Sequence, residues 1–157
     1  MIRLKSNGDK IAKSLATRLG KQINARVHKI LPQLGDIAIS EIKKRTLAGV
    51  DKDGKPFPDY SPEYKKIKHN KPGGIKAIGG SLLNRMVTRK VGNKAIIIEF
   101  SGPGAGNLSA SRLAAIHQTG QGKMPRRAFF GMKPGSSEER RIINAAKKLF
   151  GQKFSLK

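Results

Sequence analysis

Apolar residues recur every three or four positions along the N-terminal part of the chain, which is the period of an amphipathic helix. The stripe begins near Ile11 and ends near Leu47. Pro32 and Gly35 interrupt it, so the pattern predicts either two helices or one kinked helix over residues 9–47. Gly49 follows as a natural helix stop.

Two apolar segments in the middle of the chain predict a β-hairpin. Residues 82–91 and 94–100 flank Gly92-Asn93, a pair that tolerates the positive φ angles of a tight turn. The run Ala95-Ile-Ile-Ile-Glu-Phe100 predicts either burial on both faces, or burial on one face and a subunit contact on the other. A further strand is expected near residues 128–130.

The second half of the chain adds shorter helices to this picture. A helix is expected from Ser109 to His117, and a last helix from Ser136 to Gly151, where Ser136 and Glu139 have capping-box spacing. Ser61-Pro62 predicts the start of a short helix ending at Lys68.

These elements predict an α+β fold. Long N-terminal helices and a C-terminal helix are expected to pack on a small, mainly antiparallel sheet, with long loops between them. Residues 1–151 are expected to form one domain with a flexible loop near residues 49–80, and residues 152–157 a C-terminal tail.

The net charge of the chain indicates which kinds of partner it could bind. The chain has 33 Lys and Arg against 10 Asp and Glu, a formal net charge of +23, which attracts nucleic acid or other polyanions. Hydrophobic residues make up only 37% of the chain, and such a lean core favours oligomerisation. The basic residues of the first helical segment face only one acid, Asp9; they are Lys5, Lys10, Lys13, Arg18, Lys21, Arg26 and Lys29.

Several chemistries find no support in the sequence. Without cysteine there is no disulfide and no thiolate metal site, and without an apolar run of about 20 residues no membrane partner is expected. Residues 51–54 resemble part of a calcium loop, but the flanking ligand positions do not fit. The glycines of residues 102–106 lack the spacing of a phosphate-binding loop. A hydrolase centred on His117 is a third hypothesis, but no catalytic partner accompanies the histidine. No enzyme activity, metal or cofactor is expected.

Four segments resemble, in the same order, the phage virion morphogenesis or tail completion family of tailed bacteriophages. They are Gly54-Lys-Pro-Phe-Pro-Asp-Tyr-Ser-Pro-Glu-Tyr-Lys-Lys66, Gly80-Ser-Leu-Leu-Asn-Arg-Met86, Ala114-Ala-Ile-His-Gln-Thr-Gly120 and Arg127-Ala-Phe-Phe-Gly131. The chain is also similar to other small neck and tail-terminator proteins.

The resemblance implies a structural virion protein, assembled in the host cytoplasm, that forms a ring, commonly sixfold, at the head–tail junction. Tail-tube and head-connector proteins would be its neighbours, and genomic DNA would pass through the channel. The residues implicated in assembly are Tyr60, Ser61, Pro62, Leu82, His117, Gln118, Gly120, Arg127, Phe129 and Phe130. Those expected to face DNA or the channel are Lys65, Lys66, Lys68, Arg126 and Arg127. The alternative is a free basic protein that binds DNA without sequence specificity.

Overall fold

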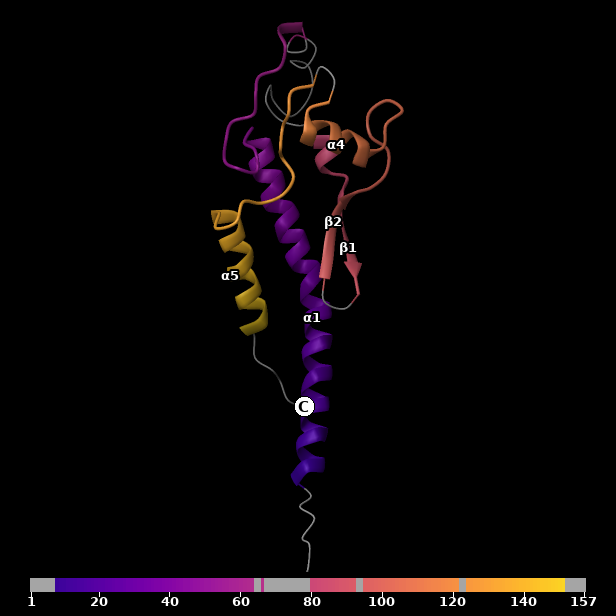
Figure 1. Ribbon diagram of the computed structural model, residues 1–157, viewed down its shortest axis with the longest axis vertical. Helices are drawn as coiled ribbons and strands as arrows, with labels where there is room; N and C mark the ends of the chain where they lie inside the picture. Colours follow the sequence, from indigo (N-terminus) through magenta and orange to yellow (C-terminus); the bar gives the residue numbers. More distant parts are fainter. Residues whose placement is uncertain (1–7, 64–65, 67–79, 93–94, 122–123, 152–157) are drawn as a thin grey trace, which may run out of the picture.

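One helix, α1 (Gly8–Leu47), forms the long axis of the molecule (Figure 1). The computed structural model describes residues 8–63, 66, 80–92, 95–121 and 124–151. Pro32 lies inside α1 without dividing it, so the chain adopts one continuous helix, whose two halves are inclined to each other in Figure 1. Gly49 stops the helix as predicted: its φ is 78°, and its amide donates to the Thr46 carbonyl at 3.0 Å.

The predicted hairpin is present but shorter than expected. Strands β1 (Met86–Val91) and β2 (Ala95–Phe100) pair antiparallel, with Met86 opposite Phe100 and Val91 opposite Ala95. Asn93 of the predicted turn and the expected strand start at Lys94 lie outside the described residues. The expectation that the first strand starts at residue 82 is wrong, because Leu82 belongs to a helical turn, α3 (Gly80–Leu83).

Only one face of the hairpin is covered by the rest of the described chain. Met86 is buried, whereas Val87, Val91 and Ile97 on the opposite face are each about two-fifths exposed. Burial of β2 on both faces, one of the two predicted alternatives, is therefore not found in the single chain. We call the exposed apolar residues Val87, Val91 and Ile97 the outer hairpin patch.

Gly35 lets α1 approach the hairpin closely. A Cβ atom built at this glycine would lie 2.7 Å from the Ile96 Cδ1 atom and would also clash with Thr88. The glycine that interrupts the apolar stripe in the sequence is thus a packing site between α1 and both strands.

Helices α4 (Ala110–Thr119) and α5 (Ser137–Gly151) form where the two helices of the second half of the chain were predicted. Ser109 caps α4 by accepting from the Arg112 amide, and Ser136 caps α5 by accepting from the Glu139 amide at 3.2 Å. The Glu139 carboxylate completes a variant of the capping box, since it accepts from the Gly135 amide at 2.6 Å. The strand expected near residues 128–130 is not formed, and this segment is irregular.

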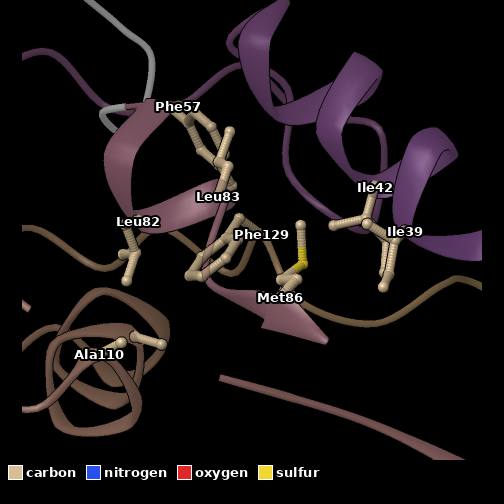
Figure 2. Close-up of a cluster of buried hydrophobic side chains, with 9 residues drawn as sticks. Ile39, Ile42, Phe57, Leu82, Leu83, Met86, Ala110 and Phe129 are labelled. Atoms are coloured by element: carbon tan, nitrogen blue, oxygen red, sulfur yellow. The ribbon is translucent and has the colours of Figure 1, made fainter. Parts of the chain in front are cut away.

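The hydrophobic core lies where α1, α3, β1 and α4 meet the segment around Phe129 (Figure 2). Phe129 is completely buried and lies between Leu83 and Met86, with Ile39 and Ile42 reaching in from α1. The Phe129 ring also packs edge-on against Phe100, with centroids 5.7 Å apart.

The architecture is the α+β class that the sequence predicts, with a long N-terminal helix, a C-terminal helix and a two-stranded antiparallel sheet. Helix α1 contacts both α5 and the hairpin, which lie on opposite sides of it in Figure 1. α1 is therefore the element that holds the other parts in place.

Candidate assembly site around Arg127

Gln118 fastens the last turn of α4 to the irregular segment that follows. Its amide nitrogen Nε2 donates to the Phe130 carbonyl at 3.1 Å, and its oxygen Oε1 accepts from the Phe130 amide at 3.0 Å. The Gln118 side chain therefore pairs with both the N–H and the C=O of Phe130, as the backbone of a neighbouring strand would. The adjacent Arg127 amide donates to the His117 carbonyl at 2.7 Å, which adds a second link between the same two segments.

Arg127 lies at the centre of this contact and is completely buried. Its guanidinium Nη2 donates to the Pro58 carbonyl at 3.1 Å, and its Cζ atom lies 3.8 Å from the centroid of the Tyr60 ring. The prediction that Arg127 faces the DNA or the channel is therefore wrong for this chain. A buried cation needs hydrogen bonds and electron-rich partners, and the segment around Pro58 supplies both.

The Arg127 contact also changes the chemistry of Tyr60. Burial raises the pKa of the Tyr60 hydroxyl above its usual value, and the positive charge of Arg127 opposes part of that rise. Tyr60 therefore stays neutral and acts as a ring surface for the guanidinium. We call the set Tyr60, His117, Gln118, Arg127 and Phe130 the Arg127 junction.

His117 is buried near the end of α4. Only 8% of the residue is exposed, so a substrate has little access to its imidazole. Among the described residues no group of three His, Cys, Asp or Glu side chains is placed to hold a metal ion. In the same part of the chain no helix is long and apolar enough to cross a membrane.

The other residues predicted for assembly divide into buried and exposed ones. Leu82 is in the core, whereas Ser61 and Pro62 are exposed. Gly120 ends α4 with a φ of 74°, and a Cβ atom there would lie 2.7 Å from the Arg126 backbone nitrogen. The close approach explains why a glycine is required at the α4 exit.

The residues predicted to face DNA have different positions. Lys66 and Arg126 are exposed, as a contact with DNA requires. Lys65 and Lys68 lie outside the described residues, as do residues 67–79 of the predicted flexible loop and the predicted tail at residues 152–157.

Arg45 is a central residue of the site that the sequence analysis missed. From α1, its guanidinium donates three hydrogen bonds. Two go to the carbonyls of Phe129 and Gly131, the latter at 2.9 Å, and one goes to the Glu138 carboxylate at 2.5 Å. The sequence signal was a basic residue in the last turn of a helix, which is normally read as a favourable interaction with the helix dipole.

A second charged contact connects α1 and α5 beside Arg45. Arg141 lies 2.6 Å from the Glu41 carboxylate, and Lys44 lies 3.5 Å from it. Burial acts to raise the pKa of Glu41, but the positive charges of Arg141 and Lys44 outweigh it and hold the pKa below its usual value. These groups line an open pocket of about 500 Å³, whose acids are already paired with its own cations.

The Asp51 side chain stabilises the turn at residues 51–54. The Asp51 Oδ1 atom accepts from the amides of Asp53 and Lys55 at 2.9 and 2.8 Å. This oxygen is thus occupied by backbone donors, which is the geometry of an ordinary Asx turn.

The N-terminal part of α1 extends beyond α5 and the hairpin (Figure 1). Every residue from 13 to 25 is exposed except the half-buried Gly20. Leu15, Leu19 and Ile23 are each about half exposed and are spaced four residues apart, so they form one stripe on this segment. We call residues 13–25 the projecting segment and these three residues the α1 stripe.

Comparison with known proteins does not extend this picture: no family model matches the chain, and no curated protein or solved structure matches it either. The site must therefore be interpreted from its own geometry. The Arg127 junction joins separate segments through backbone hydrogen bonds, while the α1 stripe and the outer hairpin patch leave two apolar surfaces open.

Proposed function

We propose that this protein is a structural subunit of a tailed bacteriophage, which forms a ring at the head–tail junction and surrounds the DNA channel. The observation that carries the proposal is the convergence of the four resembling segments. Tyr60, Leu82, Gln118 and Arg127 come one from each segment, and the segments meet in the core and the Arg127 junction. Segments that define a family are expected to meet in this way when they maintain a shared fold.

The two open apolar surfaces support an oligomer. The α1 stripe is a contiguous exposed apolar row, which a single domain rarely leaves without a partner. The outer hairpin patch is smaller, because the Arg89–Glu99 ion pair lies on the same face of the hairpin. The α1 stripe and the outer hairpin patch lie on different elements, so a contact between them joins unlike surfaces of two copies. Contacts of this heterologous kind generate a closed ring when the rotation between copies closes.

Electron microscopy of the purified protein in negative stain tests the proposal. The wild-type protein is expected to form rings, alone or when added to tails that lack it. Leu15→Gln/Leu19→Gln/Ile23→Gln is expected to abolish them, because glutamine keeps the helix propensity of the stripe and removes its apolar surface.

A matched variant of the same helix controls for the number of substitutions. Ser14→Gln/Thr17→Gln/Asn24→Gln changes three exposed polar residues of the projecting segment and is expected to leave rings intact. A wild-type protein that stays monomeric and is absent from phage particles contradicts the proposal. Rings that survive loss of the stripe contradict the assigned interface.

A further inference from the structure

The projecting segment carries cations that no acidic side chain in the described part of the chain pairs with. Lys13, Arg18 and Lys21 are all exposed, and no Asp or Glu occurs between residues 10 and 35. Among the described residues, the ion pairs lie elsewhere: Arg45–Glu138, Arg141–Glu41, Lys44–Glu41, Arg89–Glu99 and Lys52–Asp53. The three cations of the projecting segment are therefore open to an external anion.

The geometry of the helix separates these cations from the α1 stripe. An α-helix turns about 100° per residue, so residues two positions apart point in nearly opposite directions. Lys21 lies two positions from Leu19, and Lys13 lies two positions from Leu15. The two lysines thus face away from the stripe and Arg18 lies at its side, so a protein partner on the stripe leaves the lysines accessible.

We propose that this basic face, formed by Lys13, Arg18 and Lys21, contacts the phosphate backbone of duplex DNA without reading its sequence. The two lysines are eight residues apart, or about 12 Å along the helix axis. Duplex DNA carries one charge per about 1.7 Å of its length, so several phosphates lie within reach of the face. The inference rests on the proposed function only for the source of the DNA, which is the genome in the channel.

The test measures binding to a fluorescently labelled duplex of mixed sequence by anisotropy over a series of salt concentrations. Each phosphate contact contributes about 0.9 to the slope of log K against log salt. Lys13→Gln/Arg18→Gln/Lys21→Gln is expected to reduce the magnitude of the slope by about 2.7. Its helicity should be unchanged, because lysine, arginine and glutamine have similar helix propensities; far-UV circular dichroism checks this.

Lys133→Gln/Lys147→Gln/Lys148→Gln is the matched control. It removes the same formal charge from exposed positions near and on α5, and is expected to change the slope by less than about 1. Equal effects of the two triple variants would mean that only total charge matters, and would overturn the proposal. Wild-type protein that does not bind the duplex also overturns it.

Vesicles of phosphatidylserine and phosphatidylcholine distinguish a lipid surface, the other anionic partner of a basic amphipathic helix. If Leu15→Gln/Leu19→Gln/Ile23→Gln abolishes vesicle binding while the basic triple variant binds the duplex normally, the segment binds lipid and the proposal is wrong.

Negative-stain images of the basic triple variant separate this inference from the proposed function. Rings with an unchanged salt slope refute only the DNA contact, whereas absence of rings in the wild-type protein refutes the function.

Discussion

Gln118→Ala is expected to destabilise the fold by about 1.5–2 kcal/mol. The substitution removes both hydrogen bonds between the Gln118 amide and the backbone of Phe130. A hydrogen bond contributes about 1 kcal/mol net, and a buried partner left unsatisfied costs about 1–3 kcal/mol. Phe130 is only half-buried, so water can replace part of the lost hydrogen bonding. Each of its two backbone groups is therefore expected to cost about 1 kcal/mol, the low end of that range. Alanine is also the better helix former, which returns a few tenths of a kcal/mol.

Urea unfolding followed by circular dichroism measures this difference, at a protein concentration low enough to keep the chain monomeric. Gln22→Ala is the matched control, because Gln22 is exposed in the middle of α1 and the same atoms are removed. Its stability should change by no more than about 0.5 kcal/mol. Gln118→Glu keeps an acceptor for the Phe130 amide and loses the donor to its carbonyl, so an intermediate loss is expected.

The midpoint and the slope of the unfolding curve must be read together. A lower midpoint at unchanged slope means lost stability, as the reasoning requires. If Gln118→Ala unfolds within about 0.5 kcal/mol of both wild type and Gln22→Ala, the side chain does not hold the two segments together. The structural role assigned to the Arg127 junction would then be wrong.

Two further predictions test the backbone and the charges. Gly54→Ala should lower the stability of the fold by about 1–2 kcal/mol, because the φ of Gly54 is 85°, in the left-handed region. Gly120→Ala should cost at least about 1 kcal/mol more, since its Cβ atom would also lie 2.7 Å from the Arg126 backbone nitrogen. Equal thermal melting points of the two variants would contradict this. The pKa of Glu41 is lowered in the folded state by Arg141, so its carboxylate stabilises the fold above the unfolded pKa and this stability is lost as pH falls through the folded pKa. The stability gap between wild type and Glu41→Gln should therefore narrow in acid; a gap that is constant with pH would refute the assignment.

Local signals in the sequence were sufficient for most of the secondary structure. The three- and four-residue spacing of α1, the caps at Ser109 and Ser136 and the stop at Gly49 each depend on neighbours within one turn of helix. Such signals are present in the sequence because the atoms that satisfy them are a few residues away.

The errors arose where distant residues decide the outcome. Leu82 begins an apolar run that fits a strand or a helix equally well, and its packing against α4 and Phe129 selects the helical turn. Arg127 was expected to face DNA or the channel, but it is buried against a carbonyl partner, Pro58, that lies 69 residues away in the sequence. Arg45 was missed for the same reason, since its partners lie more than 80 residues further along.

The attachment of α5 has a consequence for how the molecule opens. None of the residues of α5 is buried, and its links to α1 include Arg45–Glu138, Arg141–Glu41 and the bond from Arg26 to the Leu149 carbonyl at 3.0 Å. An element that contributes half-buried side chains and polar contacts, but no residue of the buried core, separates from its neighbour at a lower free energy than an element of the core does. α5 is therefore the part of the fold that can detach as a unit while the core around Phe129 stays closed.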